Sequence, residues 1–166
     1  MPGRRPFDTV LKPVIGQFFS AGADSLKASI KVTQIEKGGK YDVKASISGG
    51  TLDAAVEGQY DSATGCHAEI SALEKCQPAS NVTLRVSPPP CKRCAFVLDF
   101  YRRKHGWTIE GPIKAFGATS GGSYFVPDFV LDDVILDELV VKGIISQDEA
   151  NTNRDKIKSY FMTATW

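Results

Sequence analysis

Four side chains with metal-binding or proton-transfer chemistry fall in two short stretches of the sequence. His67 and Glu69 are separated by one residue, and Cys91 and Cys94 are separated by two. Imidazole nitrogen and thiolate sulfur are common zinc ligands, and two cysteines in the first turn of a helix can bind one ion together. Pro90 suits a position at or just before that helix start, because its missing N–H costs nothing there. The spacing predicts one Zn²⁺ ion held by His67, Cys91 and Cys94.

Three protein ligands are typical of a catalytic zinc ion, because the fourth tetrahedral position is then left for water. Zinc lowers the pKa of bound water from ~16 to roughly 7, so that hydroxide is available at neutral pH. Glu69 lies two residues beyond the histidine, where its carboxylate can transfer protons without binding the metal. Together the two stretches resemble the H-x-E and P-C-x-x-C signature of zinc-dependent deaminases, which implies a reaction that replaces an exocyclic amino group with oxygen and releases ammonia.

A structural zinc site, or no metal site at all, is the alternative interpretation. A lone C-x-x-C or H-x-E is a weak signal, but here they lie 24 residues apart in a chain with four cysteines and two histidines. A structural site more often has a fourth protein ligand, for which Cys66 and Cys76 are the candidates. Cys66 would point away from the metal if it shared a helix with His67. We therefore expect a catalytic site, with Cys66 and Cys76 as small buried hydrophobic residues.

Length and composition favour a single domain over the whole chain, 1–166. The 166 residues are 42% hydrophobic, which is enough for one domain with its own core. No apolar run of about 18 residues could span a membrane, and no signal peptide is found at the start, so we expect a soluble protein that acts in the cytoplasm. A monomer is favoured.

The hydrophobic pattern divides this domain into an N-terminal helical extension (1–25), a core (26–126) and C-terminal helices (127–166). Alternating apolar residues over 26–33 and 41–48, around Gly38 and Gly39, predict a two-stranded hairpin. Residues 51–65 are expected to be a loop at the mouth of the site.

Helices and strands should alternate through the rest of the core. Helices are predicted at 67–76 and 91–104, with a strand at 82–86 between them. Further strands are predicted at 113–117 and 123–126, antiparallel because the turn between them is short. Helices should follow at 131–142 and from Ser146, where Ser146 and Glu149 match a capping box.

The two motifs and the order of elements around them resemble the zinc-dependent cytidine deaminase-like superfamily. The resemblance covers roughly residues 26–126 and rests on His67-Ala68-Glu69, on Pro90-Cys91-Lys92-Arg93-Cys94, and on the order strand, strand, helix, strand, helix, strand, strand, helix. It implies an α/β fold, a three-layer α-β-α sandwich with a mixed five-stranded sheet whose fifth strand is antiparallel. It also implies Glu69 as the catalytic residue and one catalytic Zn²⁺.

Within the superfamily, an antiparallel fifth strand is similar to the free-nucleoside deaminases and the bacterial toxin deaminases. The hairpin, its exit at Ser48-Gly49-Gly50 and the residues Ser71-Ala72-Leu73 after the H-x-E resemble the toxins that deaminate cytosine in DNA. This resemblance implies single- or double-stranded DNA as substrate, an immunity protein as partner, and delivery within a longer secreted polypeptide. Adenine in place of cytosine and RNA in place of DNA stay open.

The charge distribution gives a second indication of a polynucleotide substrate. Residues 85–114 carry seven Lys or Arg against two Asp or Glu, whereas residues 128–149 carry one against seven. Cations between the zinc cysteines could hold phosphates at the rim of the site, although charge runs are as often solvated faces. The candidate substrate-binding residues are Tyr60, as an aromatic on which a base could stack, and Ala68, Ser87, Pro90, Lys92 and Arg93.

Two other functions fit the same sequence. A free cytidine or nucleobase deaminase should convert cytidine and be indifferent to oligonucleotides. A zinc-stabilised nucleic-acid-binding module without catalysis should have a protein atom as its fourth zinc ligand.

Overall fold

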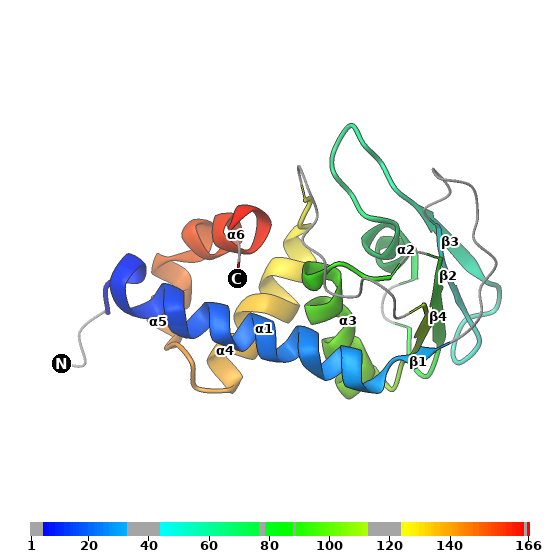
Figure 1. Cartoon of the computed structure of the whole chain (residues 1–166), viewed down its shortest axis with the longest axis horizontal. Helices are drawn as coiled ribbons and strands as arrows, with labels where there is room; N and C mark the ends of the chain where they lie inside the picture. The colour runs from blue at the N-terminus through cyan, green and yellow to red at the C-terminus, as the bar shows by residue number, and fades with distance from the viewer. Residues whose placement is uncertain (1–4, 33–43, 77–78, 88, 113–123, 165) are drawn as a thin grey trace.

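The computed structural model of the chain describes residues 5–32, 44–76, 79–87, 89–112, 124–164 and 166. In Figure 1 a sheet stands at one end of an elongated molecule, and helices extend from it toward the opposite end. The long helix α1 (Lys12–Ser29) runs between the two ends and leads into the first strand. Among the described residues, no helix has the length and apolar character needed to cross a membrane.

The described strands form one mixed five-stranded sheet in the order β1-β5-β4-β2-β3. β1, β5 and β4 are parallel, whereas β2 is antiparallel to both of its neighbours. The prediction of an α/β fold with a mixed sheet is therefore confirmed. The strands are β1 (Lys31–Val32), β2 (Lys44–Ser48), β3 (Val56–Gln59), β4 (Thr83–Val86) and β5 (Thr108–Gly111).

The hairpin predicted over residues 26–48 is wrong in its first strand. Residues 26–29 belong to α1, and β1 pairs with β5 instead of β2. Residues 26–29 are helical despite their alternating apolar pattern, because Leu26 continues the buried face of α1 that includes Phe19 and Ala23. The ring of Phe19 packs 5.0 Å from that of Phe96 in the core. Residues 33–43 lie outside the described part of the chain.

The observed hairpin is β2 and β3, joined by residues 49–55, which begin with a turn in which the N–H of Leu52 donates to the carbonyl of Gly49 at 3.0 Å. Gly49 and Gly50 have positive φ, +82° and +53°, which suits the turn predicted at the end of β2. β3 lies inside the segment 51–65 that we expected to be a loop. Its fully buried residue is Gly58, and Val56 is its one apolar side chain, so the strand shows no alternation by which the sequence could have identified it.

The two motif-bearing helices are confirmed. α2 (Ala68–Cys76) and α3 (Lys92–His105) begin directly after His67 and Cys91, and β4 lies between them in the chain. Gly106, in the left-handed conformation at φ +68°, ends α3.

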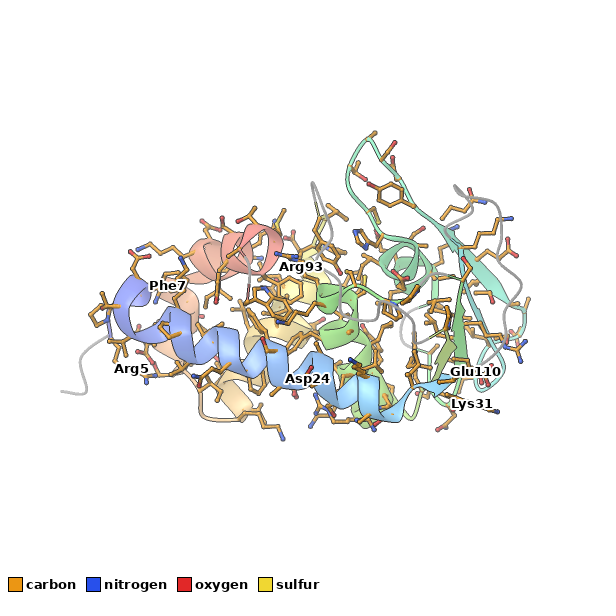
Figure 2. All side chains as sticks on the ribbon, viewed as in Figure 1. Arg5, Phe7, Asp24, Lys31, Arg93 and Glu110 are labelled. Atoms are coloured by element: carbon orange, nitrogen blue, oxygen red, sulfur yellow. The ribbon has the colours of Figure 1, made fainter. Side chains whose placement is uncertain are left out.

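The last strand of the sheet lies earlier than predicted. β5 ends at Gly111, and residues 113–117 lie outside the described residues. The sequence does not indicate this strand, because it contains the acidic residue Glu110. In the structure Glu110 is buried and forms ion pairs with Arg85 (2.9 Å) and Lys31 (3.5 Å). Figure 2 shows Glu110 and Lys31 side by side.

The antiparallel strand predicted at 123–126 is not found among the described residues. No strand is formed by Tyr124, Phe125 and Val126, and Ser123 is outside the described residues. Both observed neighbours of β5 are parallel to it.

The predicted C-terminal helices are confirmed, and the capping box of Ser146 and Glu149 is present at α5. The N-terminal helix is also confirmed but continues to Ser29, and a π-helical turn, η1 (Phe7–Leu11), precedes it. The C-terminal segments are η2 (Val130–Leu136), α4 (Asp137–Val141), α5 (Gln147–Thr152) and α6 (Arg154–Thr163).

Candidate metal centre

The three predicted ligands converge. Nδ1 of His67 lies 3.6 Å from Sγ of Cys91 and 3.7 Å from Sγ of Cys94, and all three ligand atoms lie within 4.8 Å of one another. With Zn–S near 2.3 Å and Zn–N near 2.0 Å, a tetrahedral site places nitrogen and sulfur roughly 3.6 Å apart. The chemistry and the spacing of these donors therefore fit a metal ion such as zinc.

Local structure fixes the positions of these ligands. Cys91 is the N-cap of α3, and its sulfur accepts a hydrogen bond from the backbone N–H of Cys94 at 3.4 Å. Cys94 follows in the first turn, where the positive end of the helix favours thiolates. His67 immediately precedes α2, and its carbonyl accepts a helical hydrogen bond from the N–H of Ser71. The first turns of α2 and α3, which precede and follow β4 in the chain, thus meet at the site.

The three candidate ligands hold their protons unequally. The hydrogen bond from Cys94, aided by His67, holds the pKa of Cys91 well below the usual thiol value, whereas burial raises the pKa of Cys94. Burial by itself lowers the pKa of His67, but the neighbouring Cys91 outweighs it and the net shift is upward. Metal binding at this site would therefore release the proton of the Cys94 thiol.

Glu69 faces the same cluster from the first turn of α2. Its side chain is buried, with the residue 3% exposed, and its Oε2 accepts a hydrogen bond from Sγ of Cys94 at 3.2 Å. Burial raises the pKa of this carboxyl group. A buried carboxyl beside the ligands, and outside the ligand set, is placed to exchange protons with a bound reactant.

The other two cysteines are not part of the cluster. Sγ of Cys66 contacts Oε1 of Glu74 at 3.6 Å, and Sγ of Cys76 contacts the carbonyl oxygen of Leu73 at 3.8 Å. Burial raises the pKa of the Cys66 thiol to about 12 and that of Cys76 to about 11, so both remain protonated. Among the described residues the cluster therefore has no fourth protein ligand.

Comparisons of this chain with protein-family models, with curated proteins and with solved structures found no match. What is established is an α/β fold that brings together one histidine and two cysteines able to hold a metal ion.

Sequence reasoning missed Tyr124, which the structure brings into the centre. Its hydroxyl lies 3.1 Å from Sγ of Cys94, and its ring packs 4.6 Å from the ring of His67. The residue is 1% exposed. Tyr124 falls in the strand predicted at 123–126, and no motif marks a residue 30 positions beyond its sulfur partner.

The structure also places Tyr60 next to the ligands. Its ring centroid lies 5.7 Å from that of His67, edge to face, and the residue is 45% exposed. Ala68 and Pro90 are buried beside His67 and Cys91 in the chain. Ser87 instead exchanges hydrogen bonds with the backbone of Lys44, at the start of β2.

Arg93 does not occupy the expected rim position. It is 5% exposed, and its guanidinium donates to the carbonyl oxygens of Phe161 and Ala164 at the end of α6. Figure 2 shows its side chain in the region between α3 and α6. The ammonium of Lys92 donates to the carbonyl of Trp166 and lies 5.2 Å from the centre of its indole ring. Both cations hold the C-terminal segment against the first turn of α3.

Much of the basic charge in residues 85–114 is likewise used internally. Arg102 and Arg103 each bind the buried carboxylate of Asp99, at 2.7 and 2.8 Å. Arg103 also reaches Glu138 at 2.9 Å and so joins α3 to α4. These ion pairs reduce the charge that this segment can offer to phosphates.

Proposed function

We propose that this protein is a zinc-dependent deaminase that converts cytosine to uracil in a polynucleotide, with DNA favoured. The observation that carries the proposal is a set of three ligands with the buried carboxyl of Glu69 directed at the same point. A structural zinc site does not require a carboxyl group that is not a ligand, whereas hydrolytic deamination requires one as general acid and base.

Zinc bound by the three ligands would supply a Lewis acid that activates water for attack at C4 of the base. Glu69 would accept a proton from that water and deliver it to the ring nitrogen N3. It would then help to protonate the leaving amine, so that water and cytosine give uracil and ammonia. The raised pKa of the buried carboxyl suits both directions of transfer.

The order of elements supports a cytidine deaminase-like fold, including the three-layer α-β-α arrangement. The order strand, strand, helix, strand, helix, strand is present in β2, β3, α2, β4, α3 and β5, with one motif at the start of each helix. The hairpin in this order is 44–59, with its glycine turn after Ser48.

An exposed aromatic side chain beside the ligands supports a base as substrate. Tyr60 could stack on a base, which contributes ~1–3 kcal/mol per base in single-strand binding proteins. The base would come from a single strand or be flipped out of a duplex at a cost of a few kcal/mol. With the toxin resemblance, the proposal extends to delivery in a longer secreted polypeptide and to an immunity protein as partner.

A second candidate, free cytidine deamination, is favoured by one observation. Arg93 is buried against α6, and Arg102 and Arg103 are paired with carboxylates, so these cations are not offered to a polymer. The non-catalytic zinc module is disfavoured, because the described residues supply no fourth ligand.

The test is a panel of substrates incubated with the zinc-loaded protein and, in parallel, with zinc-loaded Glu69→Gln as the blank. The panel contains single- and double-stranded DNA and RNA with cytosine or adenine, and free cytidine. Uracil formed in a polymer but not from cytidine is the expected result and identifies the preferred strand form. Turnover of cytidine alone would favour the second candidate, and turnover of no substrate would contradict both.

A further inference from the structure

Tyr124 joins the two ligand-bearing segments from a distant part of the chain. Its hydroxyl contacts the sulfur of Cys94 at the start of α3, and its ring packs edge to face against the imidazole of His67 before α2. The next residue is held too, since the N–H of Phe125 donates to the carbonyl of Gly65 at 3.0 Å. The segment is therefore attached to the loop before His67 and to the first turn of α3.

The direction of the Tyr124 hydrogen bond follows from the chemistry of the bound site. A cysteine that ligates a metal is a thiolate and has no proton to donate. The hydroxyl of Tyr124, buried at 1% exposure, has one O–H to donate. The hydroxyl of Tyr124 must then be the donor and Cys94 the acceptor.

We propose that Tyr124 is a positioning residue of the metal centre, which donates a hydrogen bond to the Cys94 thiolate and holds the His67 ring in its ligating orientation. The inference depends on the metal site of the proposed function but not on the reaction. Partners of this kind fix ligand orientation, and their removal commonly weakens metal binding by roughly 10- to 100-fold.

The decisive variant is Tyr124→Phe, which removes the hydroxyl and keeps the ring packed on His67. Tyr101→Phe is the matched control, because Tyr101 is a buried tyrosine of α3 that packs on Trp107 at 4.8 Å, outside the ligand cluster. Zinc affinity of the full chain would be measured by competition with a chromogenic chelator. Cobalt substitution would report on the sulfur through its charge-transfer absorption.

We expect Tyr124→Phe to bind zinc roughly 10- to 100-fold more weakly, with Tyr101→Phe unchanged. The cobalt charge-transfer band should move to longer wavelength, because a thiolate that loses a hydrogen bond gives up electron density more readily. Equal zinc affinities and identical cobalt spectra would overturn the role of Tyr124 while leaving the metal centre intact. An unmodified protein that binds no zinc would overturn the metal centre and this inference together.

Discussion

In the proposed function, Glu69 is the residue that would distinguish a catalytic centre from a structural one. Its carboxyl is buried against Cys94 and is not one of the metal ligands. Glu69→Gln keeps the size and the burial but cannot accept a proton. We expect it to retain zinc and to lose deaminase activity by at least ~10²-fold, measured as uracil formation with zinc content determined on the same sample. Near-normal activity in the zinc-loaded variant would remove Glu69 from the mechanism.

The cysteines divide into two that could hold a metal ion, Cys91 and Cys94, and two buried packing residues, Cys66 and Cys76, and substitution can separate the two classes. Cys94→Ala removes a ligand, so elemental analysis should find the purified protein depleted of zinc. Cys66→Ala and Cys76→Ala are matched controls, since both are buried thiols outside the cluster, and should keep one zinc per chain. Loss of zinc from either control would reveal a fourth protein ligand and favour the structural interpretation.

At the scale of elements, the close approach of β3 to α2 holds the H-x-E segment in place. A Cβ atom added at Gly58 would lie 2.1 Å from the carbonyl oxygen of Ala68 and 2.4 Å from the amide nitrogen of Ala72. These are backbone atoms of a helix, which cannot move aside singly. Gly58→Ala should therefore lower the free energy of unfolding by about 1–3 kcal/mol, measured by urea denaturation.

The control for Gly58→Ala is Glu57→Ala on the same strand. Glu57 is exposed, so its substitution should change stability by no more than ~0.5 kcal/mol. A Gly58→Ala protein as stable as the control would show that β3 and α2 can separate without cost.

Arg93 gives a second prediction about how the elements are held together. Its guanidinium binds the last carbonyls of α6, so Arg93→Ala leaves buried acceptors without donors. We expect a loss of roughly 1–3 kcal/mol in unfolding free energy. A phosphate contact would behave differently: the variant would be as stable as the parent and would only bind polynucleotide more weakly. Thermal denaturation without substrate distinguishes the two outcomes.

At the scale of the whole molecule, an ion pair connects the N-terminal segment to α5. Arg5 donates to both carboxylate oxygens of Glu149, at 2.9–3.0 Å, and its hydrogen bond lowers the pKa of Glu149 to about 2, from an ordinary value of 4.5. Because the folded-state pKa is the lower one, the stabilisation is complete above about pH 4.5 and is lost as the pH falls through about 2.

This linkage predicts the pH profile of a pair of variants. The unfolding free energies of the parent and of Glu149→Gln should differ at neutral pH and converge as the pH falls from about 4.5 toward 2. Arg5→Gln should show the same convergence, because it removes the other partner. A difference that stays constant across this range would show that the ion pair does not stabilise the fold.

The sequence predicted the parts of this molecule that depend on local chemistry. The ligands, Glu69, the helices that follow His67 and Cys91, and the capping box of Ser146 could all be found from residue type and spacing. Each of these features involves residues close together in the chain or a motif with a chemical requirement.

The features that depend on tertiary packing could not be predicted. Residues 26–29 fit a strand and a helix equally well until packing of α1 on α3 decides between them. β3 has a glycine as its buried residue, and the hydroxyl of Tyr124 reaches Cys94 only through the fold. The position of Arg93 depends likewise on α6, which lies far along the chain.

The most direct test of the central claim is the coordination of zinc in the intact protein, measured by X-ray absorption together with metal content. The account predicts one zinc per chain, bound by two sulfurs near ~2.3 Å, one imidazole nitrogen near ~2.0 Å and one oxygen from solvent. A third sulfur or a second protein nitrogen in the first shell, or a protein that binds no zinc, would contradict a catalytic metal centre.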